Sequence, residues 1–173
     1  MKYLYLKCLY IILPFFILAA NAPTQERLAL VIGNGDYYSV PSLANPVNNA
    51  KYMAIVLENL GFKVILKLNA SKKAMKKDVR EFGQGLHRDD VALFYYAGYG
   101  LQFQNKNYLV PINANIKAYN NIKFEGFDVK NILHRMKKAN REGVNIVILD
   151  ASRDNPFHIK IRKGLAEMKA PLG

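Results

Sequence analysis

Apolar residues along this chain form short uninterrupted runs that alternate with stretches of amphipathic periodicity. The uninterrupted runs are rich in branched and aromatic residues and cover residues 27–33, 62–68, 91–97 and 145–150. Runs of this length and composition are typical of strands that are buried on both faces of a sheet. The pattern therefore predicts four buried strands.

Three helices are predicted between these strands, because apolar residues recur there at spacings of three or four. The first begins at Pro46, in the first helical position where proline is tolerated, with Asn45 as its cap. The second covers residues 72–87 and is capped by Ser71, and the third covers residues 124–139.

The alternating order of strands and helices favours a parallel sheet with right-handed crossovers and helices on both faces. The predicted fold class is therefore α/β, with three layers in one domain that covers residues 23–173. In an open parallel sheet, ligands bind beyond the carboxyl ends of the strands. Two strands end there in site-like loops, VALFYYAGYG at residues 91–100 and NIVILDASRDNPF at residues 145–157.

Residues 1–22 have the composition of a signal peptide. Two lysines lie near the start, residues 8–18 form an apolar run too short to span a bilayer comfortably, and Ala20-Asn21-Ala22 is a small-x-small cleavage site. We therefore expect an exported protein, either periplasmic or secreted. An uncleaved N-terminal anchor is the alternative.

The one cysteine, Cys8, lies within this leading segment. Residues 23–173 therefore have no thiol for a disulfide, a thiolate metal site or a cysteine nucleophile. The histidines, His87, His134 and His158, are scattered and do not form a metal-binding motif, and no dense acidic loop predicts a calcium site. We expect neither a metal nor a cofactor.

The formal net charge is +12, and +10 once Lys2 and Lys7 are removed with the leading segment. A basic protein outside the cytoplasm meets anionic lipid, cell-wall polymer or acidic partners, so contact with an anionic surface is one hypothesis. A high content of Lys, Asn and Ile is equally typical of low-GC coding sequence. The lysines are spread over several elements without interleaved aromatic residues, so we predict no nucleic-acid binding.

The two site-like loops resemble those of the caspase/metacaspase-type cysteine peptidases. Further segments match in the same order: LVIGN at residues 30–34, LANPVNNA at 43–50, NYLVP at 107–111 and GLAEMKAPLG at 164–173. In that family the first loop ends in His-Gly and the second contains Asp-Ala-Cys or Asp-Ser-Cys. Tyr99 stands where the resemblance implies the general-base His, and Ser152 stands where it implies the nucleophilic Cys.

The resemblance also implies how a substrate is held. The backbone amides of Gly100 and Ser152 stand at the family's oxyanion-binding positions. Asp150 stands in the primary specificity pocket, which takes Arg or Lys in metacaspase-like members, and Asn49 replaces a second acid there. We expect such a pocket to bind a basic side chain more weakly than a pocket with two acids. A carboxylate that bonds to the loop backbone is the alternative role for Asp150.

Tyrosine and serine are poor substitutes for histidine and cysteine. A free phenol has a pKa of about 10, so about one in a thousand is ionised at pH 7, and a serine hydroxyl is a weak nucleophile without a base. We therefore predict a non-catalytic protein that binds a peptide or a protein partner, with a Tyr99–Ser152 hydrogen bond filling the site. The alternatives are a weak Ser152-dependent hydrolase with a Tyr99 pKa lowered by Arg153, and a truncated remnant of an active protease.

The resemblance implies further strands after the last matched segment, which would complete the substrate groove. This chain ends at Gly173, where the next strand is expected to begin. The strand at residues 145–150 would then be an unprotected edge, which proteins normally avoid. We expect a partner, a second copy of the chain or the C-terminal segment to cover this edge, unless the product is truncated.

Other conspicuous residues are predicted to be structural. Asp89 and Asp90 are expected in a solvated turn before the third strand, and His87 is expected at the end of the second helix. Several aromatic residues near the loops are expected to pack in the core rather than to form a peptide-binding wall: Phe94, Tyr95, Tyr96, Phe103 and Tyr108.

Overall fold

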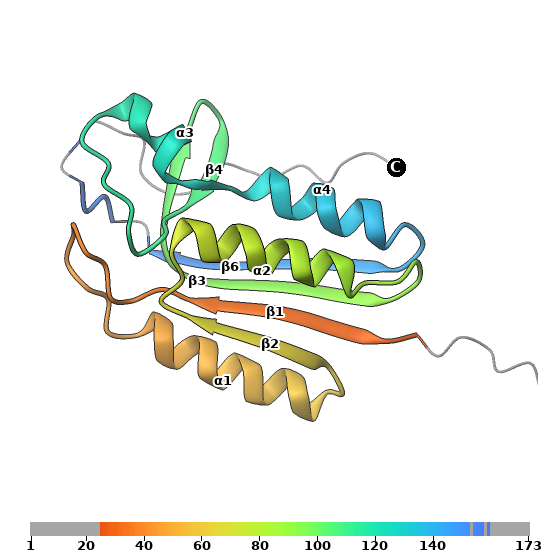
Figure 1. Ribbon diagram of the computed structural model, residues 1–173. Helices are drawn as coiled ribbons and strands as arrows, with labels where there is room; N and C mark the ends of the chain where they lie inside the picture. Colours follow the sequence, from red (N-terminus) through yellow and green to blue (C-terminus); the bar gives the residue numbers. More distant parts are fainter. Residues whose placement is uncertain (1–24, 153, 158, 160–173) are drawn as a thin grey trace, which may run out of the picture.

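A computed structural model describes residues 25–152, 154–157 and 159, so the predicted signal peptide and the matching segment at 164–173 lie outside the described residues. The described part forms one six-stranded sheet (Figure 1). Its strands are β1 (Arg27–Gly33), β2 (Lys63–Leu68), β3 (Val91–Phe103), β4 (Lys106–Leu109), β5 (Phe127–Asp128) and β6 (Val144–Ser152). Strands β2, β1, β3 and β6 are parallel neighbours in that order, and β4 and β5 add antiparallel pairs to the far end of β3.

Helices cover both faces of the sheet (Figure 1). Helix α1 (Pro46–Asn59) covers one face, and α2 (Lys72–Gln84) and α4 (Val129–Ala139) lie side by side over the other. A single 3-10 turn (Tyr119–Asn121) leads into the short helix α3 (Ile122–Glu125) near β4. The predicted α/β fold with a mostly parallel sheet is confirmed.

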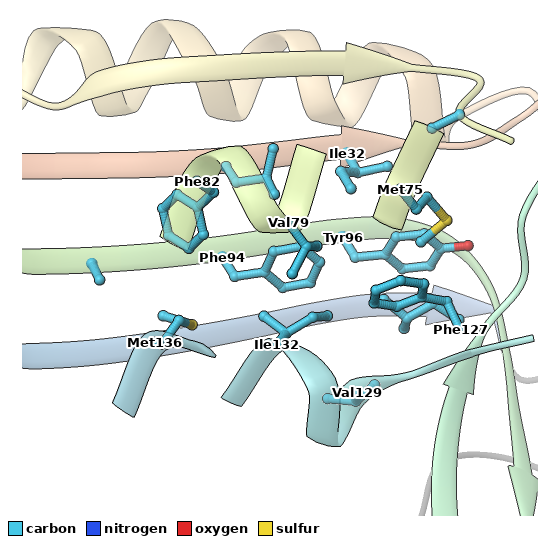
Figure 2. Close-up of a cluster of buried hydrophobic side chains, with 14 of the residues drawn as sticks. Ile32, Met75, Val79, Phe82, Phe94, Tyr96, Phe127, Val129, Ile132 and Met136 are labelled. Atoms are coloured by element: carbon cyan, nitrogen blue, oxygen red, sulfur yellow. The ribbon is translucent and has the colours of Figure 1, made fainter. Parts of the chain in front are cut away.

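Successive residues of β1 supply two different cores, because side chains of a strand alternate between its faces. Leu30 and Ile32 pack under α2 and α4, whereas Ala29 and Val31 pack under α1. All of them are fully buried, which explains why the strand has no polar side chain after the exposed Arg27 at its start. Figure 2 shows the first of these cores, in which aromatic rings of β3 meet apolar side chains from both α2 and α4.

Strand β3 extends to Phe103, well past its predicted end at residue 97. Up to Tyr99 it pairs with β6, and from Gly100 onward it pairs with β4. Gly98 permits this change of partner, because its φ of +152° is one that other residues rarely adopt. A Cβ at Gly98 would also lie only 2.5 Å from the hydroxyl oxygen of Tyr96.

Several predicted helix ends differ from the observed ones. The third helix begins at Val129 rather than at residue 124, because the Asp128 side chain caps it by accepting a hydrogen bond from the Lys130 amide. Asn45 makes no capping bond, since its backbone already has helical dihedral angles. The cap predicted at Ser71 is confirmed by a bond of 3.3 Å from the Ala74 amide.

Asp90 is buried, so the prediction of a solvated turn is wrong for this residue. Its side chain is 2% exposed and accepts hydrogen bonds from the backbone amides of His87 (2.7 Å) and Glu26 (3.2 Å). His87 therefore belongs to this turn rather than to the end of α2, which ends at Gln84. The carboxylate joins the beginning of β3 to the segment before β1, a long-range contact that the local pattern does not reveal.

Asn34 joins the carboxyl ends of three segments through a fully buried amide. Its side-chain oxygen accepts a hydrogen bond from the Ala70 amide (2.8 Å), and its nitrogen donates to the carbonyl oxygens of Val110 (3.1 Å) and Ala70 (3.3 Å). Its backbone amide donates to Ala97 of β3 (2.9 Å). The amide thereby fixes the loops that follow β1, β2 and β4 against one another.

Replacing Asn34 should destabilise the fold because Asn34→Ala removes the acceptor for the Ala70 amide. The Val110 carbonyl keeps its bond from the Tyr96 hydroxyl (2.9 Å), so the loss is concentrated on one buried donor. An orphaned buried donor costs about 1–3 kcal/mol, and we expect a loss of that size in urea unfolding. The control is Asn48→Ala on the exposed side of α1; equal losses in the two variants would contradict this role for Asn34.

Buried phenols should make the protein less stable in alkali. Burial raises the pKa of Tyr37 to about 12 and raises that of Tyr96 as well. An unfolded tyrosine ionises near pH 10, so the folded state retains these protons longer. The stabilisation is complete below about pH 10 and is lost as the pH rises through about 12. For Tyr37 it amounts to about 3 kcal/mol.

The free energy of unfolding in urea, measured from about pH 9 to about pH 11.5, should therefore fall steadily. Tyr37→Phe should make the fall shallower, because the variant has one fewer shifted phenol. An unchanged slope in the Tyr37→Phe variant would show that this hydroxyl is not the titrating group.

Candidate functional site

A cleft of about 270 Å³ opens where the carboxyl ends of β3 and β6 meet the beginning of α1. The loop before α1 and the first turn of that helix form one wall, and the last residues of β6 form the other. The lining residues are Leu43, Ala44, Asn45, Pro46, Asn49, Gly98, Asp150, Ala151 and Ser152. The structure therefore brings together Asn49, Asp150 and Ser152, three residues that the sequence places in a site.

Asp150 is the only acidic residue among those that line this cleft. Its Oδ2 atom accepts hydrogen bonds from the Asn49 side-chain nitrogen (2.9 Å) and from the Tyr95 hydroxyl (2.9 Å). The positive end of the α1 dipole lies on the same side of the cleft and favours a negative charge there. The Oδ1 atom makes no bond within the described part of the chain and is open to a ligand.

Tyr95 orients Asp150, a role that the sequence analysis missed by assigning this residue to the core. Burial, followed by the hydrogen bond to Asp150, raises the pKa of Tyr95 far above its ordinary value. The phenol therefore remains a neutral donor at any physiological pH. The strand register could have revealed the contact, since Ala97 pairs with Asp150 and Tyr95 precedes Ala97 on the same face.

Tyr99 faces away from the cleft. Its ring packs against Tyr37 with 4.9 Å between ring centroids, and its hydroxyl donates to the Pro41 carbonyl (3.2 Å). The single phenolic proton is therefore used, and the predicted Tyr99–Ser152 hydrogen bond is wrong. The backbones of Tyr99 and Ser152 are nevertheless paired in the β3–β6 register. The contacts of the Tyr99 side chain, and not the positions of the strands, therefore keep its hydroxyl from that of Ser152.

The pKa of Tyr99 is shifted in the direction opposite to that required of a base. Burial raises this pKa, and the negative charge of Asp154 raises it further. The serine hydrolase alternative needs a lowered pKa. Arg153, the residue proposed to lower it, lies outside the described residues, as does His158.

Ser152 lines the cleft at the last position of β6. Its hydroxyl oxygen accepts a long hydrogen bond of 3.4 Å from the Asp154 amide. Among the residues that the structure describes, no imidazole or carboxylate bonds to this hydroxyl. The side chain is therefore placed for contact with a ligand, and the described part of the chain supplies no base that would activate it as a nucleophile.

Gly100 lies inside β3, buried and opposite Leu109 of β4. The cleft is lined by Gly98 and not by Gly100. The use of the Gly100 amide for an oxyanion stays a prediction, and the Ser152 amide is the better placed of the two.

The remaining chemistry-bearing residues lie elsewhere in the described part of the chain. Within it, no group of three or more His, Cys, Asp and Glu residues is arranged to hold a metal ion. No helix in that part has the length and apolar composition to cross a membrane.

The five aromatic residues expected in the core are buried, which confirms their structural assignment.

Comparisons with known proteins identify the family of this chain. Residues 26–170 match the family model described as Caspase domain. Mucosa-associated lymphoid tissue lymphoma translocation protein 1 of Homo sapiens is 32% identical over 130 residues, and its homolog in Mus musculus matches to the same extent. These matches cover 75% of this chain and 15% of each relative, so the chain spans a small part of their length.

A solved structure supports the fold alone. The crystal structure of protein GSU0716 from Geobacter sulfurreducens superimposes with a TM-score of 0.59 at 14% identity. The match covers 73% of this chain and 50% of that one. The family model and the two relatives carry the assignment further, because they match the sequence itself over most of its length. This chain belongs to the caspase-domain family of peptidases.

Proposed function

We propose that this protein is a non-catalytic member of the family that binds a basic segment of a peptide or partner protein in the cleft beside Asp150. The observation that carries the proposal is the contrast between the two halves of the site. The acid of the specificity pocket is held in place by Asn49 and Tyr95. At the position of the base, Tyr99 is turned toward Pro41.

The energetic cost of this arrangement explains why peptide cleavage is not proposed. Loss of general-base assistance slows a reaction by about a hundred- to ten-thousand-fold, which corresponds to roughly 3 to 5.5 kcal/mol. The raised pKa of Tyr99 makes its phenolate rarer than in free tyrosine. An alcohol in place of a thiolate adds a further penalty.

The cleft itself supports recognition of Lys or Arg. A carboxylate that is already oriented by two donors loses little freedom when it accepts a third group, and a charge-assisted bond is stronger than a neutral one. Asn49 supplies polarity without a second negative charge, so the pocket holds one cation with one acid. Binding of moderate strength is the expected result.

The proposal extends to the exposed side of β6. In the described part of the chain β6 pairs with β3 alone, and Val144 and Ile148 are 51% and 37% exposed. A free strand edge can take an added strand from a partner or from a second copy of this chain. Export to the periplasm or the outside remains part of the proposal and rests on residues 1–22.

The first test is a cleavage assay with fluorogenic peptides that carry Arg or Lys before the reporter group. We expect no turnover above that of the Ser152→Ala variant, because no base within the described residues bonds to the hydroxyl. The comparison of the two proteins removes the contribution of contaminating proteases. Turnover by the wild-type protein that disappears in Ser152→Ala would replace the binding proposal with a serine-dependent hydrolase.

The second test measures binding of a short Arg-containing peptide by calorimetry. Asp150→Asn should weaken binding by about tenfold or more, because it removes a charge-assisted hydrogen bond. Asp89→Asn is the matched control, since it makes the same charge change at the other end of β3. A peptide with citrulline in place of Arg should bind the wild-type protein as weakly as the Arg peptide binds Asp150→Asn. Equal affinity of the Arg peptide for Asp150→Asn and Asp89→Asn would rule out Asp150 as the group that binds the Arg side chain.

A further inference from the structure

A second and larger cleft, of about 480 Å³, lies between α2 and α4 on the face of the sheet opposite α1 (Figure 1). Basic side chains from both helices line it. The lining residues are Lys76, Val79 and Arg80 from α2, Phe127 from β5, and Asn131, His134, Arg135 and Lys138 from α4. We call this cleft the basic groove; it shares no residue with the cleft beside Asp150.

Within the described part of the chain, no acidic side chain pairs with the cations of the basic groove. The acidic residues of α2 pair elsewhere: Asp78 is buried against Lys67 (3.6 Å), and Glu81 pairs with Lys77 (3.6 Å). Helix α4 contains no acidic residue. Within the described residues, no ion pair includes Lys76, Arg80, Arg135 or Lys138.

The local positive potential also affects a neighbouring group. Burial lowers the pKa of Lys72, and the charge of Lys76 lowers it further. Like charges on one helix and its neighbour are destabilising. Entry of an anion into the groove should therefore lower the free energy, because the anion offsets the repulsion between these cations.

The two arginines are held on facing helices. Gly83 of α2 lies so near to α4 that a Cβ placed on it would be 3.4 Å from the Cβ of Arg135. Such a distance is ordinary van der Waals contact, so the Arg135 stem packs directly against α2. Arg80 of α2 lines the same cleft, so both arginines border one space.

The floor of the basic groove offers little apolar area to a ligand. Val79 is 1% exposed and Phe127 is 4% exposed, because both belong to the core under α2 and α4 (Figure 2). A ligand therefore gains almost nothing by burying apolar groups there. Charge and hydrogen bonding must supply the affinity, which favours a compact and highly charged ligand over an amphipathic helix.

We propose that the basic groove binds a ligand with two or more phosphate groups held close together. A phosphate monoester carries about −1.5 to −2 charges at neutral pH, so two of them match the four Lys and Arg cations. Arginine binds phosphate through two parallel hydrogen bonds, and lysine binds it as a point charge. A volume of about 480 Å³ is that of a small-molecule site.

The test is calorimetric titration of the purified protein with inorganic tripolyphosphate. We expect saturable binding, weakened by at least tenfold in Arg80→Gln/Arg135→Gln, because each charge-assisted bond lost is worth about a factor of ten. The control is Lys106→Gln/Lys117→Gln, with the same charge change at exposed positions outside the groove. Gln is a good helix former and both arginines are exposed, so the groove variant should fold; circular dichroism checks this.

Two further arms identify the source of the phosphate groups. Sedimentation with phosphatidylcholine vesicles that contain cardiolipin tests a lipid headgroup, and binding that the groove variant loses would support the proposal with a lipid source. An aspartate-rich peptide tests an acidic protein segment, and tighter binding of this peptide than of tripolyphosphate would overturn it. Absence of saturable binding in every arm, or equal weakening in the control variant, would also overturn it.

Discussion

The parallel pairing of β3 with β6 is the constraint on which the site depends. Its register sets Ala97 opposite Asp150 and Tyr99 opposite Ser152, at the edge where both strands end. A slip of one residue would turn every side chain of β6 to the other face of the sheet. Two cores oppose such a slip, because Val147 and Leu149 of β6 pack against one core and Ile146 packs against the other.

The same register also relates positions 99 and 152, the two positions on which the proposed lack of catalysis rests. The backbones of residues 99 and 152 lie opposite one another on the neighbouring strands β3 and β6, as the family's mechanism would need. Its hydroxyl donates to the Pro41 carbonyl and its ring packs against Tyr37, so Tyr99 belongs to a third cluster of buried residues that also contains Tyr108 of β4. Position 150 has no such alternative partner, and its carboxylate stays in the cleft with two donors.

Sequence patterns were sufficient for the parts of this fold that depend on local periodicity. The four parallel strands and the faces of α1, α2 and α4 follow from apolar spacing, and the grouping of Asn49, Asp150 and Ser152 follows from family motifs. Apart from the shifted helix and strand ends, the errors concern contacts between distant segments. The burial of Asp90 depends on amides far away in the chain, and the orientation of Tyr99 depends on the loop that contains Pro41. Neither contact leaves a periodic signal.

The distribution of charge gives the strongly basic composition a structural meaning. Acidic side chains of the described chain are largely used within the fold: Asp90 holds a turn, Asp128 caps α4, and Asp78 is paired in the interior. Asp150 also accepts two hydrogen bonds, but it lines a cleft that we propose takes a cation. The excess of cations between α2 and α4 forms a region that favours an anion. This region lies on the other face of the sheet and shares no residue with the cleft beside Asp150. A salt-screened field falls off over about 8 Å at physiological ionic strength. Each site therefore responds mainly to its own residues, and one scaffold can hold a basic segment and a phosphate-rich ligand without direct competition.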